Sequence, residues 1–434
     1  MSDEVWIARI RERLAARVVS ANHIRDDRIA DALREVPRHL FLPQLAPESA
    51  YRDDAIVTKR DAGGQPISSS SQPAIMAIML DQLALAPGLR VLEIGAGTGY
   101  NAALMKHIVG PSGTVVSVDI DADVAGQARD HLVSAGYPDV TVVAADGAEG
   151  YPPAAPYDRV IATVGVSDLA PPWLDQTEPG GRIVVPFDVR GTQLAVAFER
   201  AADGPWMSVS LMPCGFMRMR GSLAGPERTV LLQPGLSVML PDGLTLADGK
   251  DVDAEALAAY LAGPSVELPT GVRTGSGQVV WGLGLWLAAR DPRSCTVAEE
   301  RPGPARGSRA PGSAGSCGSG AFRLVRAPVR SRGLRLTAGI VDSGGLAVLT
   351  AAAAPVQGSA AGQLTLEVTG FGPHASELAA GLLAQVHAWD HAGQPGAGGL
   401  HVDAYPRSSG AEPDPAHGGL LIERPSMRFV VYHA

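Results

Sequence analysis

The feature that most constrains the fold of this chain is an alternation of strand and helix patterns that begins at Arg90. Short apolar runs typical of buried strands lie at 90–94, 113–120, 140–147, 157–165 and 181–187. Helical patterns at 100–109 and 122–136 separate the first three runs, and two more strand-like runs follow at 192–201 and 206–221. Strands that alternate with helices predict an α/β fold with a parallel, doubly wound sheet.

A glycine-rich loop, "VLEIGAGTGY", joins the first predicted strand to the first helix. Gly95, Gly97 and Gly99 let the chain turn sharply and let a ligand approach the backbone without meeting a Cβ atom. The helix that follows offers unpaired N–H groups at its N-terminus. The loop therefore predicts a cofactor site, although glycines that serve only tight strand–helix packing stay an alternative.

Acidic residues at the ends of the next two strands fit a nucleoside-type cofactor. Asp119 lies twenty residues beyond Gly99, where a carboxylate accepts hydrogen bonds from ribose hydroxyls. We expect Ile120 beside it to contact the cofactor, and Asp146 and Gly147 to meet the adenine.

The nearest competing reading of the loop is a dehydrogenase that binds a dinucleotide. Glu93 precedes Gly95 by two residues, and a carboxylate there would repel a pyrophosphate. A cofactor with a sulfonium and an amino-acid tail suits this loop better. The loop thus favours S-adenosylmethionine, with S-adenosylhomocysteine as the product.

A row of four serines, Ser68–Ser71, precedes Gln72-Pro73 and an apolar helical pattern. Hydroxyls beside a cofactor can donate hydrogen bonds to a substrate without adding charge. We expect Ser71, with Ser70, to be catalytic. An alternative is that Ser68–Ser70 form only a flexible turn that caps the helix from Pro73.

Length and composition predict two domains. A chain of 434 residues exceeds what one hydrophobic core usually organises. Beyond about residue 225 the sequence changes to short strand patterns separated by many Gly and Pro residues. We therefore expect a first domain at 1–225 and an α+β domain at 226–434. The stretch 301–320 is rich in Gly, Pro, Ser and Arg and predicts a flexible loop in the second domain.

Composition also argues against several classes of protein. The net charge of −9 disfavours general nucleic-acid binding. No apolar run is long enough to span a bilayer, and the N-terminus lacks the pattern of a signal peptide, so we expect a cytoplasmic protein. The three cysteines have no metal-ligand spacing, and His387 and His391 lack a third ligand, so we expect no metal.

Several separate motifs, in order, resemble the protein-L-isoaspartate O-methyltransferase family over about the first 220 residues. They are "VPRHLF", "AYRDDA", "SQPAIMAIML", "VLEIGAGTGY", "ADGAEGYPPAAPYDRVIATVGV" and "LDQTEPGGRIVVPF". The resemblance implies a Rossmann-like class I methyltransferase sheet whose last two strands are exchanged in order. It also implies methyl transfer from S-adenosylmethionine to a peptide carboxylate.

Residues of this chain fall on the family's functional positions. The resemblance makes Ser71 the active-site serine and places the cofactor at Glu93, Gly95, Gly97, Asp119, Asp146 and Gly147. We expect the substrate at Ser69, Gln72, Pro73 and Thr163. Ser68–Ser70 depart from the Thr-Ile pair usual in the family.

The second departure is length, because the family normally ends near residue 220. The extension, "SSSSQP" and "CGFMRMRG" resemble a longer subgroup found with ribosomally made peptides such as lanthipeptides and graspetides. That resemblance implies methylation of an aspartate in a modified, macrocyclic precursor peptide, followed by succinimide or isoaspartate formation. Repair of isoaspartate in damaged proteins is the alternative, and a non-catalytic peptide-binding protein is a third possibility.

An arginine-rich stretch could attract an acidic peptide. Eight arginines and no acidic residue lie between Glu300 and Asp342: Arg301, Arg306, Arg309, Arg323, Arg326, Arg330, Arg332 and Arg335. We expect Arg323 and Arg326 to contact the substrate. A solvated loop in an arginine-biased chain is the alternative.

Overall fold

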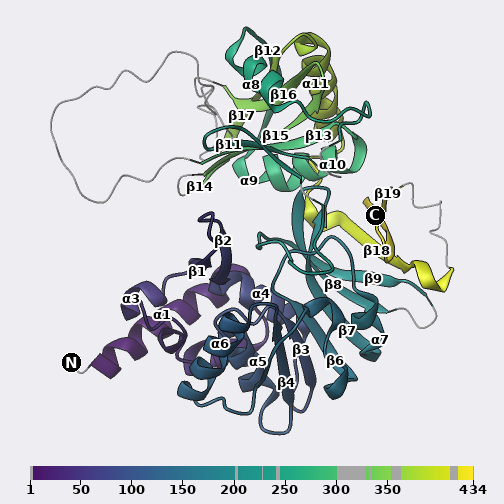
Figure 1. Ribbon diagram of the computed structural model, residues 1–434. Helices are drawn as coiled ribbons and strands as arrows, with labels where there is room; N and C mark the ends of the chain where they lie inside the picture. The colour runs from purple at the N-terminus through teal and green to yellow at the C-terminus, as the bar shows by residue number, and fades with distance from the viewer. Residues whose placement is uncertain are drawn as a thin grey trace. The chain divides into compact units, whose positions relative to one another are not determined.

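A computed structural model of the chain describes residues 3–200, 204–226, 228–240, 245–300, 329–331, 334–352, 363–410 and 419–433 (Figure 1). The chain divides into two compact units. Unit 1 comprises 1–188, 193–225 and 401–432, and unit 2 comprises 189–192, 226–400 and 433–434.

Unit 1 is built on a ten-stranded sheet with the order β19-β20-β18-β9-β8-β7-β6-β3-β4-β5. The bounds are β3 Arg90–Ile94, β4 Thr114–Asp119, β5 Thr141–Ala144, β6 Tyr157–Ala162, β7 Thr177–Val189, β8 Thr192–Arg200, β9 Trp206–Pro213, β18 Leu400–Pro406, β19 Leu420–Glu423 and β20 Met427–His433. Strands β5, β4, β3, β6 and β7 are parallel, as the alternation predicted. Strand β8 lies beside β7 and β9 lies outside it, which is the exchanged order that the resemblance implied.

Three strands at the C-terminal end of the chain extend this sheet. Strand β18 pairs antiparallel with β9, through Asp403 opposite Met207, and β20 and β19 follow. The predicted boundary had assigned all of 226–434 to the second domain. Residues 401–432 belong instead to unit 1, because their backbone groups complete the ladder that begins at β9.

Helices of unit 1 pack their apolar side chains onto the sheet in one core. The bounds are α1 Asp3–Asn22, α2 Asp27–Glu35, η1 Arg38–Phe41, α3 Pro47–Ala50, α4 Pro73–Leu83, α5 Tyr100–Val109, α6 Ala122–Ser134, η2 Gly147–Glu149, η3 Pro152–Ala154 and α7 Pro171–Asp175. In the amphipathic helix α1, Leu14 and Val18 are buried in this core, together with Met79, Leu104 and Leu132 of the later helices.

A β-hairpin stands apart from the large sheet. Strands β1 (Ile56–Arg60) and β2 (Pro66–Ser70) pair with each other and with no other strand among the described residues. Figure 1 shows the hairpin projecting from the helices of unit 1. Ser68–Ser70 lie on strand β2 and not in the flexible turn that was the alternative for them, and Ser71 follows the end of the strand.

Unit 2 is an α+β unit with an antiparallel sheet of order β10-β11-β13-β15-β16-β17-β12, and β14 pairs with β15. The strands are β10 Thr229–Gln233, β11 Leu236–Met239, β12 Ser265–Gly275, β13 Ser294–Glu300, β14 Val329–Ser331, β15 Leu334–Asp342, β16 Gly345–Ala351 and β17 Gln363–Phe371. The helices of unit 2 are α8 Ala254–Ala262, α9 Ser276–Gln278, η4 Val279–Gly284, α10 Leu285–Arg290, α11 Ala375–His391 and η5 Ala397–Gly399. One further short helix, η6 (Arg407–Ser409), follows β18 and belongs to unit 1. One face of α11 is apolar and buried, through Leu378, Leu382, Val386 and Trp389. The predicted flexible loop at 301–320 lies outside the described residues.

Within the described residues, we find no helix with the length and apolar character needed to cross a membrane.

Candidate active site

A pocket of about 540 Å³ opens at the carboxyl ends of the parallel strands in unit 1. This edge is where ligands bind in open α/β sheets. The glycine loop after β3 and the loop after β4 line one side. The β1–β2 hairpin and the segment 213–220 after β9 line the others.

The glycine loop fits a ligand held against bare backbone. Gly97 has φ +54, and a Cβ added there would lie 3.2 Å from the carbonyl oxygen of Ser69 in the hairpin. Gly95 has φ +102, and its added Cβ would lie 2.6 Å from the Thr163 hydroxyl. Side chains at both positions would be strained and would push apart the parts of the pocket wall. Gly99 does not line the pocket, and a Cβ added there would lie 3.1 Å from the Ala128 carbonyl oxygen and 3.2 Å from the Leu132 side chain of α6.

Asp119 is the carboxylate best placed to bind ribose. It ends β4, lines the pocket and is 9% exposed. One oxygen accepts the Gly97 N–H at 3.1 Å and the other accepts the Asp121 N–H at 3.0 Å, so each oxygen keeps a lone pair for a ligand hydroxyl. Burial raises the pKa of Asp119 above its usual range. Beside it, Ile120 is 40% exposed and offers an apolar surface to a base.

Two predicted cofactor residues, Glu93 and Asp146, do not line the pocket. Glu93 is fully buried, where it accepts hydrogen bonds from Asn101 and Ser117, and burial raises its pKa to about 7. Asp146 accepts the N–H groups of Ala148 and Ser222, at 3.0 and 2.7 Å. Both carboxylates hold loops of the pocket in place, and contact of either one with the cofactor stays a prediction.

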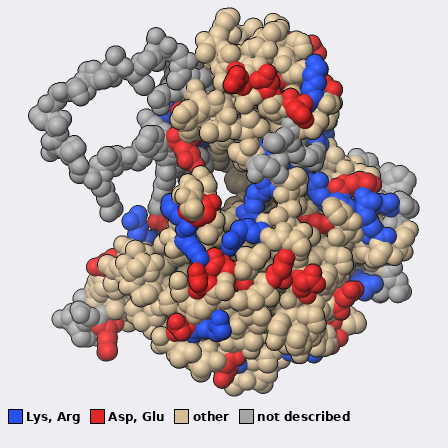
Figure 2. All heavy atoms as spheres, in the orientation of Figure 1, with Lys and Arg blue, Asp and Glu red and all other residues tan. Residues whose placement is uncertain are grey.

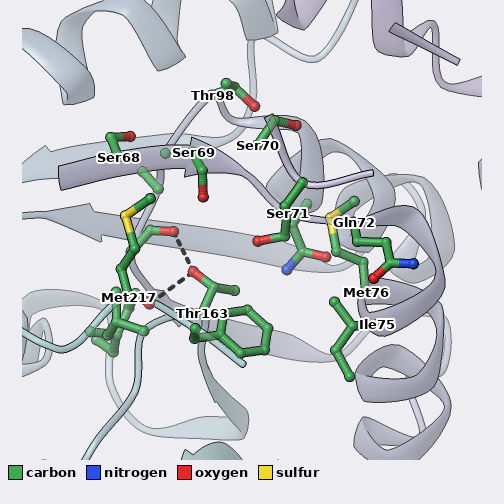
Figure 3. A pocket seen from close by; sticks show the side chains of 18 of the residues that line it. Ser68, Ser69, Ser70, Ser71, Gln72, Ile75, Met76, Thr98, Thr163 and Met217 are labelled. Carbon is green, nitrogen blue, oxygen red and sulfur yellow. Dashed lines mark hydrogen bonds between the residues drawn. The ribbon is translucent and has the colours of Figure 1, made fainter. Parts of the chain in front are cut away.

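Strand geometry decides which serines face the pocket. In a strand successive side chains point to opposite faces. Figure 3 shows the hydroxyls of Ser69 and Ser71 pointing into the pocket, while those of Ser68 and Ser70 turn away from it. Ser68 and Ser70 are buried, and the Ser68 hydroxyl accepts from Thr58 at 3.2 Å. The hydroxyl of Ser70, which was predicted to be catalytic together with Ser71, therefore points away from the pocket, although Ser70 is among the residues that line it.

Arg38, a residue of the "VPRHLF" motif, fixes the end of the serine row. Its side chain is fully buried, and the guanidinium donates to the carbonyls of Ala50, Arg52 and Asp54. It also donates to the Ser71 carbonyl at 3.0 Å and to the Ser70 hydroxyl at 3.4 Å. Arg38 was not among the predicted site residues, although a charged residue inside an apolar motif indicates buried hydrogen bonds.

The predicted substrate residues Gln72, Pro73 and Thr163 occupy different places. Gln72 lines the pocket and donates its amide to Asp53, which also caps α4 by accepting the Ala74 N–H at 2.9 Å. Pro73 is the buried first residue of α4 and does not line the pocket.

Thr163 does line the pocket, and its hydroxyl donates to the Gly95 carbonyl at 2.6 Å (Figure 3). That hydroxyl can only accept from a substrate while this bond is kept. Its main contribution is to hold the glycine loop in place through this hydrogen bond.

Sequence reasoning missed the segment after β9 as part of the site. Pro213–Arg220 lines the pocket, and the segment is tied down where Met217 O accepts the Gly165 N–H at 2.7 Å. Met219 is buried against Gly147. Cys214 also lines the pocket, but burial raises the pKa of its thiol far above the usual range, so it is no nucleophile. The "CGFMRMRG" motif in this segment was the sequence feature that could have indicated a role in the site.

The arginines between residues 300 and 342 were predicted to attract an acidic peptide, and the structure describes only some of them. Arg323 and Arg326 lie outside the described residues. Arg335 is buried in β15 and pairs with Glu299 of β13 at 3.1 Å, so it has a counter-charge and cannot attract a peptide. The described part of the chain contains no cluster of side chains suited to a metal ion.

Comparisons with known proteins agree with this geometry. The family model described as protein-L-isoaspartate(D-aspartate) O-methyltransferase matches residues 9–223. A protein-L-isoaspartate O-methyltransferase of Hyperthermus butylicus is 38% identical over 233 residues, which are 52% of this chain and 94% of the relative. One of Methanopyrus kandleri is 39% identical over 220 residues, 50% of this chain and 95% of the relative.

A solved protein-L-isoaspartate O-methyltransferase aligns over 91% of this chain and 96% of its own, at 24% identity and a TM-score of 0.48. The two sequence relatives are covered almost in full, and the segment that the family model matches includes every residue that lines the pocket. This chain belongs to the protein-L-isoaspartate O-methyltransferase family and is an S-adenosylmethionine-dependent carboxyl O-methyltransferase with the class I fold.

Proposed function

We propose that this enzyme methylates the free carboxylate of L-isoaspartyl residues in proteins and peptides, as a step in their repair. The observation that carries the proposal is one pocket that joins the glycine loop and Asp119 to the inward hydroxyls of Ser69 and Ser71. The two relatives described above are named for the L-isoaspartate substrate.

Residues of this chain would hold S-adenosylmethionine at three points. Asp119 would accept from the ribose hydroxyls, Ile120 and Gly147 would contact the adenine, and the backbone of Gly95–Gly97 would carry the amino-acid tail. When bound, the cofactor supplies an electrophilic methyl group on a sulfonium. The fit rests on the cradle at Gly97 and on the two oxygens of Asp119, which are held by one backbone N–H each.

The chemistry needs little from the protein besides placement. A carboxylate is ionised at pH 7, so no general base is required, and no histidine lines the pocket in the described part of the chain. Correct alignment alone can lower a barrier by roughly 7–11 kcal/mol. The neutral Ser71 hydroxyl would donate to the carboxylate oxygen that does not attack, which orients the other oxygen without quenching its charge.

Ser71 is a better candidate for this donor than Ser69. Its carbonyl is fixed by the Arg38 guanidinium at 3.0 Å, so its backbone is held where β2 ends and α4 is about to begin. Ser69 lies within β2, with its carbonyl close to Gly97. We assign Ser69 to the substrate backbone and Ser71 to the carboxylate.

The methyl ester has a defined fate. The backbone nitrogen of the next residue attacks the ester carbonyl, methanol leaves and a five-membered succinimide forms. Water opens that ring to aspartate or isoaspartate, so repeated cycles convert isoaspartate into aspartate. The narrower prediction, an aspartate in a modified precursor peptide, finds no support among the relatives, and repair is the reading that they favour.

A pair of isomeric peptides tests the proposal. The two peptides share one sequence and differ only in an isoaspartyl or aspartyl linkage at one position, which shifts the carboxylate by one methylene. We expect kcat/KM for methyl-ester formation to be roughly 10–200-fold higher for the isoaspartyl peptide, the range for one misplaced methylene. Mass spectrometry follows the ester. Equal rates on the two isomers, or faster modification of a cyclic precursor, would contradict repair.

We further propose that unit 2 contributes to the choice of substrate. The family match ends at residue 223, so most of unit 2 is additional to the matched segment. Rejecting wrong substrates requires contacts away from the reacting carbon. Hydrogen exchange on the full chain tests this: an isoaspartyl peptide should slow exchange within 226–400, and protection confined to unit 1 would refute it.

A further inference from the structure

The β1–β2 hairpin needs contacts outside itself to keep its position. It is a separate two-stranded sheet, and an isolated hairpin is marginally stable in water. Its residues Val57, Ile67, Ser68 and Ser69 line the pocket. The placement of the hairpin therefore sets how the serine row lies against the glycine loop, and how easily a cofactor can leave.

Arg38 anchors only the C-terminal end of β2. Its guanidinium contacts the Ser71 carbonyl and the Ser70 hydroxyl, next to α4. The other end of the hairpin, toward the turn between Arg60 and Pro66, lies several residues from this anchor. A second contact is needed there to hold the strands over the cofactor loop.

Lys59 makes that second contact. Its Nζ lies 2.8 and 2.7 Å from the two carboxylate oxygens of Asp121, and 3.4 Å from Asp123. Asp121 also caps α6 by accepting the N–H groups of Asp123 and Val124, so its carboxylate is fixed by the helix. Figure 2 shows basic side chains beside acidic ones on the face of unit 1 that carries the hairpin.

The Lys59–Asp121 pair joins the two sides of the cofactor pocket. Lys59 stands opposite Ser68 in the hairpin register, and Val57 stands opposite Ser69. Asp121 follows Asp119 by two residues and donates its own N–H to the Asp119 carboxylate. One ion pair thus connects β1, the strand paired with the serine strand β2, to the loop that would bind the ribose.

We propose that Lys59 is a positioning residue that, through Asp121, holds the β1–β2 hairpin over the bound cofactor and slows cofactor release. The inference rests on the cofactor occupying the pocket described above. It does not depend on which carboxylate is methylated.

The matched control is Arg60, the next residue of the same strand. Its guanidinium donates to the Gly64 carbonyl within the hairpin turn. Arg60→Gln therefore removes one positive charge from the hairpin without touching Asp121. Lys59→Arg keeps a cation that can reach Asp121. Asp121→Asn keeps a side chain that caps α6 and removes the negative charge.

The experiment measures dissociation of S-adenosylhomocysteine from the full-length chain by surface plasmon resonance. We expect Lys59→Gln to speed dissociation about threefold to fivefold at low salt, the effect of losing a partly exposed ion pair. Raising the salt concentration should speed dissociation from the wild type and leave Lys59→Gln unchanged, because salt screens the pair. Asp121→Asn should match Lys59→Gln, and the double variant should add nothing further.

Hydrogen exchange without any ligand gives an independent result. The amides of residues 56–70 should exchange faster in Lys59→Gln than in the wild type, with Arg60→Gln unchanged. Dissociation from Lys59→Gln as slow as from the wild type, or equal acceleration in Arg60→Gln, would overturn the proposal. Binding of S-adenosylhomocysteine needs no peptide, so failure to methylate an isoaspartyl peptide would leave this result standing.

Discussion

Ser71→Ala should slow methyl transfer about 10²–10³-fold, the usual cost of removing one preorganised donor from a reacting oxygen. Affinity for S-adenosylhomocysteine should stay close to that of the wild type, because Ser71 stands on the hairpin side of the pocket, outside the glycine loop. Single-turnover kinetics at saturating cofactor measure the first quantity, and calorimetry measures the second.

The control for this prediction is Ser68→Ala. The Ser68 hydroxyl belongs to the same row but is buried against Thr58, so its loss should leave the rate of methyl transfer nearly unchanged. A Ser71→Ala rate equal to that of the wild type would show that Ser69 or a backbone N–H supplies the donor. A loss of the same size in both variants would indicate a general disturbance of β2.

Asp119→Ala should weaken cofactor binding by about 10²-fold, because hydrogen bonds to a charged group contribute about 1.5–3 kcal/mol each. The variant also releases the Gly97 N–H, which the Asp119 carboxylate now accepts. Asp119→Asn separates these two effects, since a carboxamide oxygen can still accept from Gly97. Calorimetric titration with S-adenosylhomocysteine provides the affinities.

Asp130 of α6 offers a control for charge alone. It is exposed and does not line the pocket, so Asp130→Ala should bind S-adenosylhomocysteine like the wild type. Affinity of Asp119→Ala equal to that of the wild type would remove Asp119 from the ribose role. Because binding needs the ionised Asp119, and burial raises its pKa, affinity should fall on acidification from a higher pH than an ordinary aspartate would give.

Local sequence patterns were enough to predict most of the central sheet of unit 1 and its helices. The apolar runs at 90–94 and 157–165 and the helix at 100–109 predicted β3, β6 and α5, because buried strands and helices impose their own periods on the sequence. The returning strands β18–β20 could not be predicted this way. Their pairing with β9 joins residues nearly two hundred positions apart, and no local signal records which edge a strand will join.

The site shows the same division between local and long-range information. Glycine spacing and Asp119 located the pocket, since the loop after a strand meets the next strand's carboxyl end in any parallel sheet. The orientation of the serines depended on β2 being a strand, and the role of Arg38 depended on five groups brought together from separate segments. Arg335 is paired with Glu299 of a neighbouring strand. A count of arginines along the sequence cannot reveal such a pairing.

The most direct test of the account is a crystal structure of the full chain with S-adenosylhomocysteine and an isoaspartyl peptide. The account predicts the ribose hydroxyls on Asp119 and a carboxylate oxygen of the peptide at about 2.5–3.0 Å from the Ser71 hydroxyl. The hairpin should cover the cofactor with the Lys59–Asp121 pair intact. A peptide carboxylate bound away from Ser71, with the cofactor in this pocket, would contradict the account.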